Sequence, residues 1–341
     1  MLRVNYLVGG GKFDLLKFIL AILIVLLHTR PLSKDFQPIL RIAVPLFFIM
    51  TSFFFFNKIK YMSKNEANSA LFHFVKRNLK LYLFWFIVLL PITWIRQDWF
   101  VDGAFEGLLH IIRNFFLGST FAASWFLMAS VIGVSITLFL SRYINNKWLL
   151  AFSFACYLFC SFDANYHHLL CSSPIIDKVY AIYHKLFGTP YISFPSAMLW
   201  VALGKLIAEH QIKVAKINCY VALIFACALL YFEHFYCYHQ GWVLDDDCYL
   251  SLAIVCPLLF LTVSQHSFEF KFSKQARKIS TIMYCFHLSL LTLLNIVFPL
   301  FDYNPNRWFT FGMCFICSFS VALLILMLES KSRIKFLKYA Y

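Results

Sequence analysis

The sequence predicts an all-α protein: a polytopic membrane bundle of about ten transmembrane helices with both termini in the cytoplasm. Three observations lead to this prediction. Of the 341 residues, 61% are hydrophobic and 13% are charged, whereas a soluble domain carries about 25% charged residues. Apolar runs long enough to cross a bilayer recur along the whole chain. Positive charges gather between alternate runs, which gives the bundle a direction.

The candidate spans follow from the length that a bilayer requires, about 20 mostly apolar residues for one helix. Ten stretches meet or approach it: 13–32, 39–57, 79–96, 121–141, 147–162, 190–208, 216–233, 248–264, 279–300 and 308–328. The stretch 105–118 is also apolar but is interrupted by Glu106, His110 and Arg113. We expect it to form a re-entrant or interfacial helix.

The distribution of charge predicts the orientation of these spans. With the N-terminus inside, 22 of the 30 Lys and Arg residues fall on the inner side, and 11 of the 16 acids fall outside. Because positively charged loops stay in the cytoplasm, we expect one transmembrane domain over 1–341 in the plasma (inner) membrane of a bacterium. It would carry a basic cytoplasmic loop at 57–78, whose second half resembles a surface helix, and a basic cytoplasmic tail at 329–341.

Composition also argues against two classes of function. The net charge of +14 suits contact with anionic membrane lipid, and no nucleic-acid-binding motif accompanies it, so no nucleic-acid partner is expected. Cys314 and Cys317 have zinc-like spacing but lie mid-span without a second pair, so no metal site is expected. Cys237 and Cys248 flank an outer loop, and a disulfide or two free thiols remain open alternatives.

The first span carries the most informative polar residues, because ionisable side chains are expensive in lipid. Lys17 and His28 are 11 residues apart, which is about 20° past three full helical turns, so they share one face about 16 Å apart. Asp14 lies near the same stripe and is expected to pair with Lys17. Two interpretations of Asp14 and Lys17 stay open, a functional pair or boundary residues; His28 is the stronger candidate.

Later spans add further candidates. Arg41 begins the second span, where it is either an outer anchor or a ligand for an anion or an oxyanion. Trp125, in a Ser-Trp-Phe run, is either an interfacial anchor or a substrate contact. Tyr284 and His287 are three residues apart in the ninth span and face the same way.

Taken together, these stretches resemble the acyltransferase 3 superfamily, whose members are ten-helix membrane proteins that mostly O-acetylate surface sugars. The family pattern in the first span is an acidic residue, a basic residue, ten residues and then His, and it matches Asp14, Lys17 and His28. The family usually has Arg where this chain has Lys17. Similarity to the membrane domain of vancomycin-resistance serine racemases, regarded as a serine transporter, is also present, for example in the run from Arg41 to Phe48.

The resemblance implies transfer of an acyl group, acetyl above all, from cytoplasmic acyl-CoA to a hydroxyl of a cell-surface or lipid-linked saccharide. Acyl-CoA would be a cosubstrate, with no tightly bound cofactor. His28 would be the general base, and Lys17 would hold the coenzyme phosphates with Asp14 orienting it. Arg41 would help to bind the cofactor or the substrate, and Trp125, Tyr284 and His287 would contact the substrate.

Two alternatives remain. A transporter of a small amino acid such as serine would use Arg41 for the carboxylate and acids such as Glu233 for the ammonium. A structural membrane protein with vestigial motifs would use none of these residues. The membrane lipid and a glycan acceptor are the expected partners, and the oligomeric state is not indicated.

Overall fold

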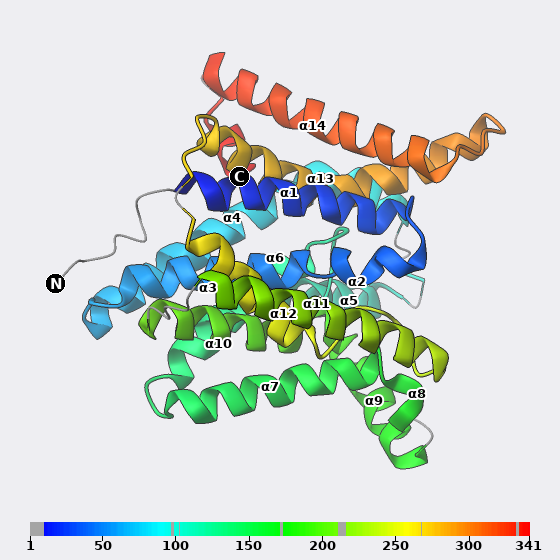
Figure 1. Ribbon diagram of the computed structural model, residues 1–341. Helices are drawn as coiled ribbons and strands as arrows, with labels where there is room; N and C mark the ends of the chain where they lie inside the picture. Colours follow the sequence, from blue (N-terminus) through cyan, green and yellow to red (C-terminus); the bar gives the residue numbers. More distant parts are fainter. Residues whose placement is uncertain are drawn as a thin grey trace.

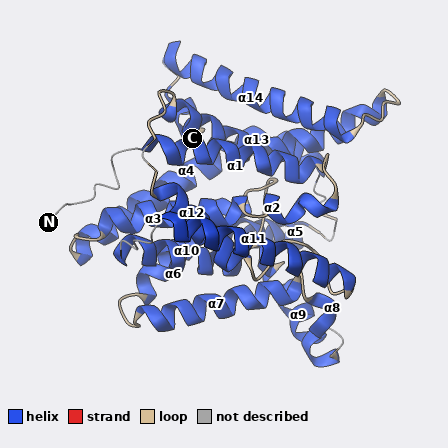
Figure 2. Ribbon diagram, viewed as in Figure 1, coloured by secondary structure: helices blue, strands red, loops and turns tan. Residues whose placement is uncertain are grey.

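The computed structural model describes residues 10–96, 99–101, 103–170, 173–210, 216–266, 268–331 and 334–341, and every regular element among them is a helix (Figure 2). The all-α prediction is therefore confirmed for the described residues. The longer helices are α1 (Gly10–Thr29), α3 (Ala43–Ile59), α4 (Lys64–Arg96), α6 (Trp125–Leu140), α7 (Asn146–Asp163), α10 (Phe194–His210), α11 (Lys216–His239), α12 (Leu252–Ser264), α13 (Ser273–Leu300) and α14 (Arg307–Lys331). The shorter ones are η1 (Lys34–Phe36), α2 (Gln37–Leu40), α5 (Ala104–Leu117), α8 (His167–Leu170), α9 (Pro174–Phe187), η2 (Pro190–Ile192) and η3 (Lys335–Tyr339).

A helix lies at each of the ten predicted spans, and α5 lies at the predicted interfacial stretch. Within the described residues, five helical stretches are long and apolar enough to cross a membrane: Lys34–Ile59, Lys64–Ile95, Asn218–His239, Ser273–Leu300 and Arg307–Lys331. The bent pair of α9 and α10 is a sixth if it counts as one span. The chain is thus a multi-pass membrane protein, while ten crossings and two cytoplasmic termini stay predictions. The N-terminal residues 1–9 lie outside the described part.

The bundle is built around two central packing groups. The helix α10 packs against α3, α6 and α7, and α1 packs against α13 and α14. In Figure 1, α14 and α7 lie on opposite sides of the bundle, with α1, α3 and α10 between them. Many of the side chains in α5, α11 and α14 are apolar and exposed, as expected for helices that face lipid.

The predicted basic loop at 57–78 is helical in its second half, as expected, and α4 begins earlier than expected, so that the non-helical part is a short turn. The helix α4 begins at Lys64 because Ser63 and Glu66 form a capping box. The backbone N–H of Ser63 donates to Glu66 Oε2 at 2.8 Å, and the N–H of Glu66 donates to Ser63 Oγ at 3.3 Å. Only a short turn therefore separates α3 from α4.

The tail predicted at 329–341 also has structure, apart from residues 332–333, which lie outside the described part. Its η3 segment folds back against α4 and α14. The indole N–H of Trp85 donates to the backbone oxygen of Ala340 at 3.0 Å. The C-terminal residues thus lie at the end of the bundle where α1 begins (Figure 1).

The close contact between α3 and α10 depends on Gly204. A Cβ at this position would lie 2.6 Å from the backbone oxygen of Ile49 and 2.8 Å from the Cβ of Ser52. We expect Gly204→Ala to destabilise the protein by about 1–3 kcal/mol, because the two backbones must move apart. Thermal unfolding of the detergent-solubilised protein measures this loss. Gly312→Ala is the matched control, since its Cβ would meet nothing within 4 Å, and equal melting temperatures for the two variants would contradict the argument.

Candidate functional site

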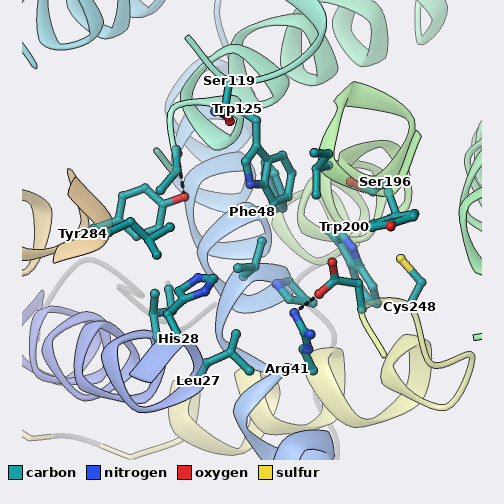
Figure 3. Close-up of a pocket in the computed structure, with 18 of the residues that line it drawn as sticks. Leu27, His28, Arg41, Phe48, Ser119, Trp125, Ser196, Trp200, Cys248 and Tyr284 are labelled. Atoms are coloured by element: carbon teal, nitrogen blue, oxygen red, sulfur yellow. Dashed lines mark hydrogen bonds and ion pairs between the residues drawn. The ribbon is translucent and has the colours of Figure 1, made fainter. Parts of the chain in front are cut away.

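A cavity of about 270 Å³ lies among α1, α3, α10 and α13 and the segments that join α5 to α6 and α11 to α12. Its walls combine aromatic rings with a few polar groups, the usual make-up of a ligand pocket. Figure 3 shows His28 and Tyr284 on one side of the cavity and Trp200 on the other. The polar and aromatic residues that line it are His28, Arg41, Phe48, Ser119, Trp125, Tyr157, Tyr191, Ser196, Trp200, Asp247, Cys248 and Tyr284. Four of the sequence-predicted site residues thus share one pocket.

His28 reaches this pocket from the last turn of α1. Ile24 and Leu27 from the same helix also line the cavity, so the C-terminal turn of α1 forms one wall. Because α1 is continuous from Gly10 to Thr29, Lys17 and His28 keep the helical relation that their spacing predicts. An imidazole that lines a pocket can act as a general base or a proton relay.

The short segment before α6 shapes the side of the pocket that holds Trp125. Ala123 has a backbone φ of 65°, a left-handed conformation that costs a residue with a Cβ about 1 kcal/mol or more. The hydroxyl of Tyr284 donates to the backbone oxygen of Ala123 at 3.1 Å. The hydroxyl of Ser119 accepts from the N–H of Trp125 at 3.3 Å. Tyr284 therefore holds the strained turn, and its hydroxyl hydrogen is already committed.

Arg41 also lines the cavity, and its guanidinium contacts a loop of three aspartates. One terminal nitrogen pairs with Asp245 at 3.4 Å and, more closely, with Asp246, and the other pairs with Asp247. Three carboxylates against one guanidinium leave this wall with a formal charge of −2. Burial raises the pKa of Asp245, and the guanidinium opposes that rise. Arg41 is thus engaged in holding the loop, a role that sequence reasoning did not assign, and its predicted anion-binding role stays a prediction.

His287 lies beside the pocket rather than in its wall. Its side chain has 0% exposure, and it is not among the residues that line the cavity. Its ring centroid is 5.4 Å from that of His28 and 6.0 Å from that of Tyr284. The sequence therefore located His287 at the site, but burial separates it from any substrate in the cavity.

Asp14 and Lys17 make no close ion pair, although the Asp14 carboxylate is near enough to act on the Lys17 ammonium electrostatically. Asp14 accepts a hydrogen bond from Ser273 Oγ at 2.5 Å and lies 4.0 Å from a guanidinium nitrogen of Arg277. The ammonium of Lys17 lies over the ring of Phe54, 5.5 Å from its centroid. Tertiary partners on α13 and α3 thus replace the local contact along α1.

The structure also bears on Glu233 and on the two cysteines that flank the loop after α11. The carboxylate of Glu233 accepts from the hydroxyl of Tyr166 at 2.7 Å and from the N–H groups of Leu250 and Ser251 at 2.6 and 2.8 Å. It therefore secures the start of α12 and does not line the cavity. Cys237 and Cys248 are both free thiols, which decides between the two alternatives left by the sequence.

Sequence reasoning missed several pocket residues. Tyr191 and Ser196 reach the cavity from η2 and the start of α10, while Trp200 lies one turn further along α10. These residues have no motif around them. The run from Asp245 to Asp247 was a visible signal, because three consecutive acids beside a span end need a counter-charge.

The sequence profile of the family described as "Acyltransferase domain" matches residues 11–327. An amino-acid racemase of Enterococcus faecalis is 22% identical over 339 residues, which cover 95% of this chain and 47% of that protein. A serine/alanine racemase of Enterococcus gallinarum is 23% identical over 59% of this chain and 29% of its own length.

The chain spans about half the length, or less, of the curated relatives it matches. No solved structure matches it significantly. The profile match, by contrast, runs from the first turn of α1 to the last turns of α14 and includes every residue that lines the cavity. By this match the chain belongs to the family of acyltransferase domains.

Proposed function

We propose that the protein is a membrane acyltransferase that moves an acyl group, acetyl above all, from cytoplasmic acyl-CoA to a hydroxyl of a cell-surface or lipid-linked saccharide. One observation carries the proposal. In a chain of this family, His28 lines a pocket with aromatic walls while Lys17 lies three turns away on the same helix. This arrangement suits a base at the acceptor and a cation for the donor.

The proposed reaction uses His28 as the base. The acceptor hydroxyl gives its proton to the imidazole as its oxygen forms a bond to the acyl carbonyl carbon. The carbon–sulfur bond then breaks, and the leaving thiolate takes the proton back from His28 as the free thiol of CoA. Acceptor, acyl group and proton are all accounted for, and His28 returns to its neutral form.

The donor and the acceptor meet different ends of the molecule in this proposal. Lys17 supports the phosphates of the donor; its ammonium lies over the ring of Phe54 and within electrostatic reach of Asp14. The guanidinium of Arg277, which is half exposed near Asp14, adds a second positive charge at the same end. Trp125, Trp200 and Tyr191 offer flat faces for a sugar ring in the pocket. We place the protein in the plasma membrane of a bacterium, with the relatives from Enterococcus as support.

The second candidate is transport of a small amino acid such as serine, and the relatives named as racemases favour it. A zwitterion would need a cation and an acid that are open to it. Arg41 is held by Asp245, Asp246 and Asp247, and Glu233 is saturated with hydrogen bonds. The contacts therefore favour acyl transfer.

One experiment separates the two candidates. Membrane vesicles that contain the protein receive labelled acetyl-CoA at the cytoplasmic face, and label is counted in the alkali-labile esters of extracted glycolipid and polysaccharide. Labelled serine uptake is measured in the same vesicles. We expect ester label above that of vesicles without the protein, and equal serine uptake in both. Serine uptake without ester label would support the transporter and overturn the proposal.

A further inference from the structure

The side chain of His287 has a fixed pattern of hydrogen bonds on one side and an unpaired nitrogen on the other. Its Nδ1 lies 2.8 Å from the backbone oxygen of Tyr284 and 3.1 Å from that of Met283. Because carbonyl oxygens only accept, Nδ1 carries the hydrogen and donates it. In a neutral imidazole the other nitrogen, Nε2, is then an acceptor. This nitrogen is buried and has no hydrogen-bond partner among the described residues.

An unpaired acceptor in a buried place is costly, and such atoms in native proteins call for an explanation. The ring of His287 is 5.4 Å from that of His28 between centroids, with 35° between the ring planes. At this separation a turn of the His28 ring about its side-chain bonds brings a ring N–H within hydrogen-bond distance of His287 Nε2. His28 lines the cavity and His287 does not, so any effect of His287 on a substrate must pass through His28.

We propose that His287 is a positioning residue for His28: when the His28 ring turns to donate a ring N–H to His287 Nε2, its other ring nitrogen faces the pocket. The same contact stabilises the positive charge that His28 gains when it takes a proton. A partner on one ring nitrogen of a histidine decides which tautomer faces the substrate. The inference rests on the proposed role of His28 as the base.

The groups next to His287 have contacts of their own. Tyr284 donates its hydroxyl hydrogen to Ala123, and the thiol of Cys314 lies 3.4 Å from the backbone oxygen of His287. The titratable and charged groups that share the cavity wall with His28 or contact His287 are Tyr284, Cys314, Arg41, Asp247, Tyr157, Tyr191 and Cys248. Arg41 and Asp247 satisfy each other across the cavity. Asp247 shares that guanidinium with Asp245 and Asp246.

Two amide substitutions test the roles of the two ring nitrogens of His287 one at a time. His287→Asn keeps a donor near Nδ1 for the backbone oxygens but removes the acceptor at Nε2. His287→Gln places its amide near Nε2 and offers an oxygen there. We expect the Asn variant to lower kcat on the order of 10- to 100-fold, with little change in the KM for acyl-CoA. The Gln variant should recover most of the activity.

A second readout does not depend on activity. Diethyl pyrocarbonate modifies neutral imidazole, so mass spectrometry of modified His28 as a function of pH reports the protonation of His28. Because the proposed contact stabilises protonated His28, the half-maximal pH should fall in His287→Asn and return toward wild type in His287→Gln. Ser289→Ala, at another buried position of α13, is the control and should change neither readout. His287→Phe replaces the Asn variant if that variant does not fold.

The results that decide the positioning role of His287 differ from those that decide acyl transfer. An unchanged modification curve of His28 in folded His287→Asn overturns the positioning role, even if acyl transfer is established. Equal losses in the Asn and Gln variants with an unchanged curve would also overturn it, since that result means a packing role. A shifted curve supports the contact, even in a protein that fails the acyl-transfer test.

Discussion

Replacing His28 by alanine should reduce acyl transfer by about 10²- to 10⁴-fold while the protein still folds. The acceptor hydroxyl then has no base to take its proton at the pocket wall. Since His28 lines the cavity, its loss widens an existing space rather than opening a new void in the core, so the melting temperature should change little. We expect the loss in kcat, because Lys17 and the rest of the donor end remain. Initial rates of ester formation from labelled acyl-CoA measure it.

The matched control for this prediction is His239→Ala, which removes an exposed imidazole at the end of α11. It should leave the rate within twofold of wild type. Transfer by folded His28→Ala at more than about one tenth of the wild-type rate would rule out His28 as the general base, since general base catalysis contributes about 10²-fold or more. The aromatic pocket would then act on a substrate in another way.

The features that a single helix fixes were the ones that the sequence predicted well. Lys17 and His28 keep one face because the rise and turn of an α-helix determine their relation. The ten helical ranges followed from apolar run lengths in the same way. Local geometry also predicted that Tyr284 and His287 lie together, although only one of them lines the cavity.

Contacts between segments that are far apart in the chain could not be predicted from the sequence. Arg41 meets Asp245 across 204 positions of the chain, and no local pattern specifies that pairing. The direct contacts of Asp14 were missed for the same reason, because Ser273 and Arg277 reach Asp14 from another helix. The early start of α4 was different, since Ser63 and Glu66 carry a capping-box signal in the sequence itself.

Replacing Arg41 by leucine should destabilise the protein and impair the pocket together. The side chains of Asp245, Asp246 and Asp247 are 38%, 13% and 20% exposed, and without the guanidinium three close carboxylates lose their nearest counter-charge. Removing one partner of a buried ion pair costs about 3–5 kcal/mol, and partial exposure here lowers the expected loss to about 1–3 kcal/mol. The loop also forms a wall of the cavity, and displacement by about 1 Å can reduce a rate on the order of 100-fold.

The pH dependence of this loss identifies its cause. Burial raises the pKa of Asp245 and Arg41 lowers it, so the Arg41→Leu variant should raise that pKa further above its value in the unfolded chain. A carboxyl with a raised folded-state pKa destabilises the fold above that pKa, and the penalty disappears as pH falls below the unfolded value of about 3.9. The difference in melting temperature from wild type should therefore be largest near neutral pH and shrink toward pH 4.

Two companion variants make the Arg41 prediction specific to charge. Asp246→Asn added to Arg41→Leu removes one repelling carboxylate and should recover part of the lost stability. Arg142→Leu removes an arginine whose guanidinium has one exposed hydrogen bond, to Asn68 at 2.7 Å, and should cost less than about 1 kcal/mol. A pH-independent loss in Arg41→Leu, or no recovery in the double variant, would mean that Arg41 acts through packing. Its alkyl chain, rather than its charge, would then hold the loop that closes the pocket opposite His28.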